Sequence, residues 1–263
     1  MAGFVCIYYG NTGSSWLIQA LGASPQVLVP GFEPVEGWAW DAPEDERLEW
    51  LGMALSPPSD RQGSVYDAWV VGLEASPQVS EVPDKAGWEQ VGLKMNDLAV
   101  FETEAVADVL ASADAKAIIL TRENRIKHAL SLYSYHEEGK SQFGHDGRLE
   151  ELRPSTKIKM RAFDRWVKES QRLHREALRV RRTLGERLGP DQMTDLSYEE
   201  FISDEGKRHT LSRLSNFLGI EPIPLADGGL KKATSNDLRS AVANYNTLKL
   251  RYSLTSMRGF FED

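Results

Sequence analysis

Small polar residues and glycines cluster near the start of the chain in a pattern that suits the binding of an anion. The stretch Gly10-Asn11-Thr12-Gly13-Ser14-Ser15-Trp16 follows the apolar run at residues 4–9 and precedes an apolar-periodic segment. Gly10 and Gly13 allow a tight turn, and the hydroxyls stand beside the unbonded N–H groups of a helix start. Free amides and the helix dipole together bind phosphate or sulfate. An ordinary strand–loop–helix turn with a serine cap is the alternative interpretation.

A second candidate anion site follows the strongly apolar run at residues 115–121. Arg122 comes directly after this run, and Ser131 comes about two and a half helical turns later. The two side chains can converge on one phosphate. Because ligands bind outside the carboxyl ends of parallel strands, this segment and the first loop could share a ligand. The alternatives are a surface ion pair for Arg122 and a packing hydroxyl for Ser131.

The elements that must position these residues alternate along the whole chain. Strands are predicted at 3–9, 27–29, 91–95, 115–121 and 193–197, and helices at 14–21, 43–55, 98–111, 124–138, 155–188, 198–203, 207–218 and 236–250. Strands separated by helices predict an α/β fold in which a central parallel sheet is flanked by helices on both faces. With no internal repeat and no convincing linker, we expect one domain over residues 1–263.

Charge and composition limit the partners. The formal net charge of −8 argues against general binding to nucleic acid. Residues 156–187 are nevertheless basic, with eleven Lys or Arg and four Asp or Glu, and a solvated helix face is the simplest interpretation. A single cysteine, Cys6, excludes an intrachain disulfide. No apolar run reaches the length of about 20 residues that spans a bilayer, and no signal peptide is recognisable, so we expect a cytoplasmic protein without a membrane span.

Four segments, in order along the chain, resemble motifs of the PAPS-dependent sulfotransferases, specifically the bacterial NodH/Stf0-like branch. They are Gly10–Trp16 for the 5′-phosphosulfate loop, Leu120–Ser131 for the 3′-phosphate motif, Leu196–Glu200 with Phe217–Ile220, and Leu238–Leu248. The resemblance implies a P-loop-like three-layer fold and transfer of the sulfuryl group of PAPS to a hydroxyl or amine of a small-molecule or saccharide acceptor, with PAP as product. It also implies that Arg122 and Ser131 hold the 3′-phosphate.

The resemblance also implies a general base for the acceptor. Members of this branch use a carboxylate from the loop after the first helix, which points to Glu33, with Glu36 as the second choice. His128 and His136 are weaker alternatives, because both fall in the helix after the 3′-phosphate motif.

One position departs from the family pattern. The family places Lys or Arg where this chain has Asn11, which donates a hydrogen bond but carries no charge. Lys94 is the candidate that supplies a charge near the leaving oxygen, and a snorkelling surface lysine is the alternative. Lys231 and Lys232 are candidates for a late 3′-phosphate contact, and no metal ligand is assigned. The departure keeps two alternatives open: a catalytically weak PAPS- or PAP-binding protein, and a P-loop kinase that uses ATP, although the chain lacks the Gly-Lys-Ser/Thr of a Walker A motif.

Overall fold

A computed structural model describes residues 3–29, 43–56, 89–96, 101–138, 155–225 and 237–261. These residues form two compact units. The first unit contains the described residues within 1–121 and 176–227, and the second contains those within 122–175 and 228–263. The expectation of one domain over the whole chain stays a prediction.

Parallel strands form the centre of the first unit. Its described residues contain β1 (Phe4–Tyr8), β2 (Val27–Leu28), β3 (Gln90–Asn96), β4 (Lys116–Thr121) and β5 (Met193–Ser197), in the spatial order β2-β3-β1-β4-β5. All the pairings are parallel. In β1, Tyr8 lies opposite Asn96 of β3 and Leu120 of β4. The predicted α/β fold with a central parallel sheet is confirmed.

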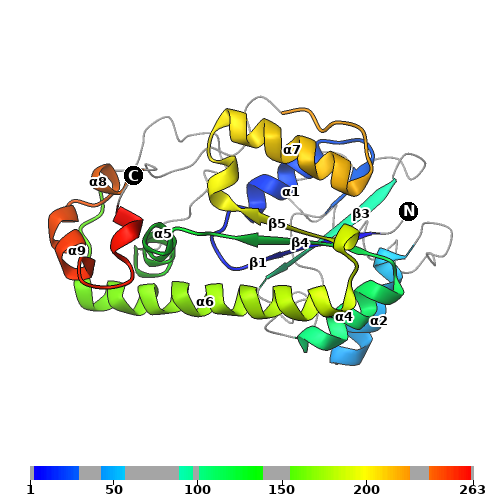
Figure 1. Ribbon diagram of the computed structural model, residues 1–263, viewed down its shortest axis with the longest axis horizontal. Helices are drawn as coiled ribbons and strands as arrows, with labels where there is room; N and C mark the ends of the chain where they lie inside the picture. Colours follow the sequence, from blue (N-terminus) through cyan, green and yellow to red (C-terminus); the bar gives the residue numbers. More distant parts are fainter. Residues whose placement is uncertain are drawn as a thin grey trace. The chain divides into compact units, whose positions relative to one another are not determined.

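Helices cover both faces of this sheet (Figure 1). On one face lie α1 (Ser14–Gly22) and α7 (Asp204–Leu218), whose leucines share a buried cluster with Phe4, Cys6, Ile118 and Leu196 of the strands. On the other face lie α2 (Glu44–Leu55), α4 (Thr103–Ser112) and the part of α6 (Met160–Arg187) after residue 175. All five residues of β1 are buried, which explains why this strand is apolar without alternation. Two short 3₁₀ helices, η3 (Pro190–Gln192) and η4 (Tyr198–Phe201), flank β5.

The second unit is built mainly from helices in its described part. It contains α5 (Arg125–Glu138), α6 up to residue 175, α8 (Leu238–Ala241), α9 (Tyr245–Tyr252) and the 3₁₀ helix η5 (Arg258–Phe261). Their apolar faces meet in one buried cluster that includes Ile126, Phe163, Leu248 and Phe261. None of the helices described in either unit is long and apolar enough to cross a membrane.

The helix predicted at 236–250 is interrupted between α8 and α9. The backbone of Thr156 donates to the Ala241 carbonyl at 2.9 Å and accepts from the Ala243 amide at 3.0 Å. The side chain of Asn244 accepts from the backbone N–H of Ile158 at 2.9 Å and donates to its carbonyl at 3.0 Å. Because these bonds to a distant segment replace those of a continuous helix, the prediction of one uninterrupted helix is wrong.

Candidate functional site

The turn between β1 and α1 has a backbone that few residue types adopt. Gly10, Asn11 and Gly13 have φ angles of 37°, 56° and 88°. Glycine reaches positive φ without steric cost, and asparagine is among the residues that tolerate it best. The residues at these three positions are therefore the types that the turn requires.

Helix α1 begins with amides that have no partner within the helix. Gly13 occupies the N-cap position, and no side chain caps this end of α1. The first intrahelical bond runs from the N–H of Leu17 to the carbonyl of Gly13 at 3.2 Å. The amides of residues 14–16 therefore have no acceptor within the helix. The serine-capped turn considered as the alternative does not form. A helix start of this kind attracts an anion through its amides and its dipole.

Thr12 adds an unsatisfied polar group to the turn. Its side chain is fully buried, yet its hydroxyl has no hydrogen-bond partner among the described residues. Leaving a buried hydroxyl unsatisfied costs about 1–3 kcal/mol, and most buried polar groups do have a partner. An oxyanion beside the turn would supply one. The turn and the first amides of α1 therefore fit a phosphate or sulfate group.

Aromatic rings of η4 pack against the turn. A Cβ atom at Gly13 would lie 2.7 Å from Cδ2 of Tyr198 and 2.9 Å from Cε2 of Phe201. The ring of Trp16 stacks on Phe201 with 4.9 Å between the centroids. Position 13 therefore needs glycine for space as well as for its φ angle. Phe201 was not recognised from the sequence, where its only signal is an aromatic residue soon after the last predicted strand.

Strand β3 places a cation and an amide beside β1. Lys94 lies opposite Cys6 in the sheet, and its Nζ is 4.8 Å from the centroid of the Tyr8 ring. Because Lys94 is only 7% exposed, the interpretation as a surface lysine is wrong. The N–H of Gly10 donates to Oδ1 of Asn96 at 3.3 Å, which ties the turn to the end of β3. Asn96 was missed because its position next to the turn depends on the register of the two strands.

The single thiol of the chain belongs to Cys6 of β1, and it is unreactive at neutral pH. Burial raises the pKa of Cys6 to about 12, and the positive charge of Lys94 opposes part of that rise. The thiol is therefore protonated at neutral pH. Since the thiolate is the reactive form of cysteine, Cys6 is not a candidate nucleophile.

The strand order puts the turn at a typical ligand position. From β1 the chain crosses to β2 on one side of the sheet, whereas from β4 it crosses to β5 on the other side. The carboxyl ends of the neighbours β1 and β4 therefore flank the point where the strand order reverses. Open α/β sheets bind ligands outside this point.

The residues predicted for the 3′-phosphate belong to the second unit. Arg122 directly follows β4 in the chain and is only 5% exposed, so its interpretation as a surface residue is wrong. Ser131 is half-buried on α5. Four further candidates, Glu33, Glu36, Lys231 and Lys232, lie outside the described residues.

Packing contacts occupy the two histidines considered as alternative bases. His128 is buried, and its Nδ1 lies 3.1 Å from the hydroxyl of Ser170 on α6. His136 is exposed, and its ring stacks on Trp166 with 4.6 Å between the centroids. Both contacts are internal to the second unit, and they weaken the case for either histidine as a general base.

No protein-family model and no curated protein matches this chain. Several solved structures do. A sulfotransferase from Alicyclobacillus acidocaldarius has a TM-score of 0.50 at 16% sequence identity, over 100% of this chain and 94% of the other. The sulfotransferase domain of the Synechococcus PCC 7002 olefin synthase has a TM-score of 0.45 at 15% identity, over 99% of this chain and 93% of that domain.

Mouse sulfotransferase SULT7A1, in complex with PAP, has a TM-score of 0.42 at 14% identity, over 86% of this chain and 60% of the mouse chain. At such identities the likeness concerns the fold. The Alicyclobacillus structure supports the P-loop-like arrangement of a central parallel sheet flanked by helices, and the two weaker likenesses add nothing to it. This chain therefore has the same P-loop-like α/β fold as the Alicyclobacillus sulfotransferase structure.

Proposed function

We propose that this protein is a sulfotransferase that moves the sulfuryl group of PAPS to a hydroxyl or amine of a small-molecule or saccharide acceptor. The observation that carries the proposal is the turn at residues 10–13, with its positive φ angles, the unbonded amides that follow it and the unsatisfied hydroxyl of Thr12. A fold alone does not define a function. The turn supports an anion site, and the four resembling segments support sulfuryl transfer as its chemistry.

The donor side of the proposal uses the start of α1. PAPS, when bound, supplies an activated sulfuryl group. The amides of residues 14–16 and the hydroxyls of Thr12, Ser14 and Ser15 would hold its 5′-phosphosulfate. Gly10 and Gly13 would let the backbone come close to the anion. Such positioning and charge stabilisation supply most of the catalysis when a charged group is transferred.

The 3′-phosphate and the acceptor involve residues from other parts of the chain. Arg122 would bind the 3′-phosphate, because a guanidinium grips phosphate oxygens in pairs and stays charged. Ser131 would add a hydroxyl, and Lys231 and Lys232 would add charge. Glu33 would take the proton of the acceptor hydroxyl or amine, with Glu36 as the second choice.

A positive charge near the leaving oxygen is assigned to Lys94 rather than to the turn. Asn11 has a φ angle of 56°, which asparagine tolerates better than lysine or arginine. Lys94 is buried on the strand next to β1, two residues before Asn96, whose side chain accepts the hydrogen bond from Gly10. The neutral side chain of Asn11 favours a second candidate function, namely a protein that binds PAPS or PAP without efficient transfer.

Transfer is tested by incubating the protein with labelled PAPS and a panel of alcohols, phenols, amines and saccharides. Label in any acceptor would support the sulfotransferase. Tight binding of PAP without transfer to any acceptor would favour the second candidate. Thermal stabilisation by ATP and magnesium, but not by PAP, would overturn both proposals in favour of a kinase.

The substitution Thr12→Val tests the anion site itself. It removes a buried hydroxyl that has no described partner, so the free protein should be as stable as the wild type or more stable, by up to about 1–3 kcal/mol. Affinity for PAP, measured by titration calorimetry, should fall by about tenfold, because one hydrogen bond to a charged group is lost.

Thr210→Val is the matched control. The hydroxyl of Thr210 is equally buried and has no partner among the described residues, but it belongs to α7 rather than to the turn. This variant should gain stability in urea unfolding and keep the PAP affinity of the wild type. Identical PAP affinities for the two variants would contradict the assignment of Thr12.

A further inference from the structure

Charge is distributed unevenly between the two units. Residues 122–175 and 228–263 contain 19 Lys or Arg and 11 Asp or Glu, a formal charge of +8. The rest of the chain contains 12 Lys or Arg and 28 Asp or Glu, a formal charge of −16, so the two parts account for the total of −8. An asymmetry of this size is typical of proteins that bind an extended anionic surface or polymer.

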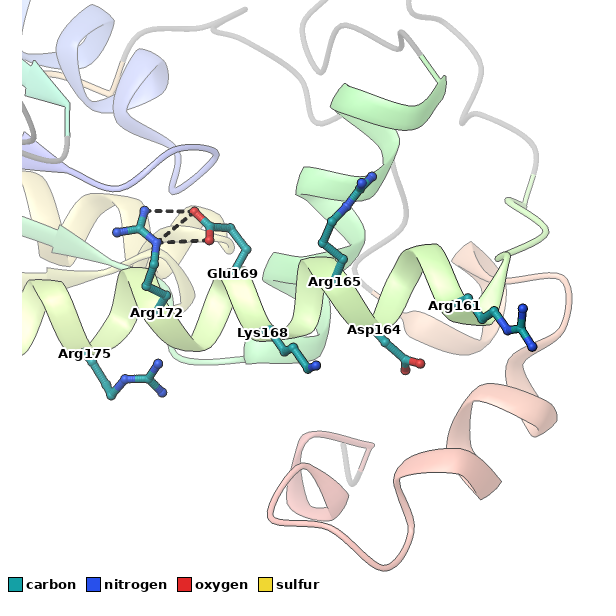
Figure 2. Close-up of a pocket in the computed structure, with 7 residues that line it drawn as sticks. All are labelled: Arg161, Asp164, Arg165, Lys168, Glu169, Arg172 and Arg175. Carbon is teal, nitrogen blue, oxygen red and sulfur yellow. Dashed lines mark hydrogen bonds and ion pairs between the residues drawn. The ribbon is translucent and has the colours of Figure 1, made fainter.

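The part of α6 in the second unit carries five of these cations, and they form two rows. The first row is Arg161, Lys168 and Arg175, and the second row is Arg165 and Arg172, each with an interval of seven residues. Seven residues make nearly two helical turns, so each row follows one side of the helix in steps of about 10.5 Å. Figure 2 shows Lys168 and Arg175 on one side of α6, and Arg165 and Arg172 on the other.

The two rows differ in their pairing. In the second row, Arg165 forms an ion pair with Glu137. Figure 2 shows the second pair of this row, between Arg172 and Glu169. Residues of the first row are all exposed, and within the described part of the chain none of them forms a hydrogen bond or an ion pair. The charges of the first row therefore remain available to an external anion.

Two exposed leucines flank the contact between α9 and α6. Leu250 and Leu254, at the end of α9 and just beyond it, are 76% and 97% exposed. Between them, the side chains of Arg251 and Tyr252 both bind Asp164 of α6, and the Tyr252 hydroxyl donates to its Oδ1 at 2.7 Å. Asp164 falls between the first two cations of the first row. This contact holds the end of α9 beside that row.

We propose that the first row and these two leucines form a docking surface for a bilayer with anionic headgroups. Cations spaced along one side of a helix suit a flat anionic surface, and projecting apolar side chains insert at the boundary between headgroups and acyl chains. A protein partner would need an apolar pocket for each leucine within an acidic surface, whereas a bilayer accepts projecting leucines at any point. The proposal does not depend on sulfuryl transfer, since docking needs neither donor nor acceptor.

Co-sedimentation with vesicles tests the docking surface. The protein is mixed with vesicles of phosphatidylcholine alone or of phosphatidylcholine with phosphatidylglycerol. It should bind only the anionic vesicles, and binding should weaken as salt is added. Replacing the three cations of the first row with glutamine should lower the partition coefficient by about 100-fold, at about fivefold for each cation. The double substitution Leu250→Ser and Leu254→Ser should lower it by about tenfold.

The second row supplies the matched control. Arg165→Gln with Arg172→Gln removes charges that are already paired on the same helix, so the loss per cation should be clearly smaller than in the first row. Ile202→Ser changes an apolar residue of the first unit that is 40% exposed and lies outside α6, and it should not affect binding. Far-UV circular dichroism checks that each variant is folded.

Three results would overturn the proposal: equal binding to neutral and anionic vesicles, equal losses for the two rows, or undiminished binding of the double leucine variant. Tighter binding to a single-stranded DNA oligonucleotide than to the anionic vesicles would also overturn it, because the surface would then belong to a polymer rather than to a bilayer.

Discussion

At the scale of single residues, Asn11 shows how a backbone requirement competes with a chemical one. Its φ angle of 56° favours asparagine over the long cationic side chains that the resembling family places there. Lys94 lies on a neighbouring strand with an ordinary backbone and can offer a charge without that restriction. Asn96, on the same strand, bonds to Gly10 and so links the cation-bearing strand to the turn. The turn thus meets the backbone requirement through Asn11, and the neighbouring strand can supply the positive charge through Lys94. This division explains why a neutral residue stands at position 11.

Gly13→Ala should damage the turn in two ways. An alanine at a φ angle of 88° is strained by about 1–2 kcal/mol, and its Cβ would collide with the rings of Tyr198 and Phe201. Overpacking of this kind costs about a further 1–3 kcal/mol. We therefore expect a loss of about 2–5 kcal/mol in the free energy of unfolding, measured with urea, together with a clear loss of PAP affinity.

Gly219→Ala separates the two causes. Gly219 ends α7 at a φ angle of 73°, and nothing lies within 4 Å of a Cβ atom placed there. Only the conformational cost of about 1–2 kcal/mol should appear, with PAP affinity unchanged. If the two variants were equally unstable, the contact between the turn and η4 would not contribute.

At the scale of elements, the sequence predicted most of the first unit because its signals are local. Apolar runs without alternation located β1 and β4 to within one residue, since a strand covered on both faces must be apolar throughout. The final helix failed for the opposite reason. Its interruption depends on backbone bonds from Thr156, which lies far away in the chain and gives no local signal.

The candidate site divides in the same way. Glycines, hydroxyls and a helix start are adjacent in the sequence, so the turn at 10–13 was predictable. Asn96, Tyr198 and Phe201 reach that turn through strand register and packing between elements, which a single sequence does not encode locally. The burial of Lys94 likewise follows from the cover of α1 and α7 over one face of the sheet rather than from its own neighbours.

The connection between β4 and α5 carries the next prediction. Arg122 follows the last residue of β4. We propose above that its guanidinium binds the 3′-phosphate. Arg122→Ala should weaken PAP binding by at least about tenfold, given about 1.5–3 kcal/mol for a charge-assisted hydrogen bond. Arg122→Lys should lose less, because it keeps the charge but not the paired geometry. Both affinities are measured by titration calorimetry.

Adenosine 5′-monophosphate provides the control ligand for these variants, because it lacks the 3′-phosphate. Its affinity should be the same for the wild type and for Arg122→Ala. A similar loss for both ligands would mean that the substitution disturbs the fold or the 5′ side, and an unchanged PAP affinity would remove Arg122 from the site.

At the scale of the whole molecule, the surface charges should respond to salt, whereas the thiol at the centre of the sheet should respond only to unfolding. The formal charges of +8 and −16 belong to residues of separate units and act mainly through the exposed surface, so salt should modulate them. The centre of the sheet is closed to solvent. Cys6, on the central strand β1 with neighbours on both sides, is reached only when the sheet comes apart. Its protonation therefore reports on the unfolding of the sheet rather than on surface electrostatics.

The stability of the protein should consequently fall at alkaline pH through this one thiol. Its pKa is raised from 9.0 to about 12 in the folded protein, so between these values the unfolded chain loses the proton while the folded chain keeps it. The free energy of unfolding is unaffected by Cys6 below about pH 9 and should then fall by about 1.4 kcal/mol per pH unit, up to about 4 kcal/mol. Urea unfolding of the wild type and of Cys6→Ala across this range measures the effect. Because alanine does not titrate, the variant should lack this part of the slope, whatever its stability at neutral pH. Parallel pH profiles for the two proteins would show that the thiol is already accessible to water in the folded sheet.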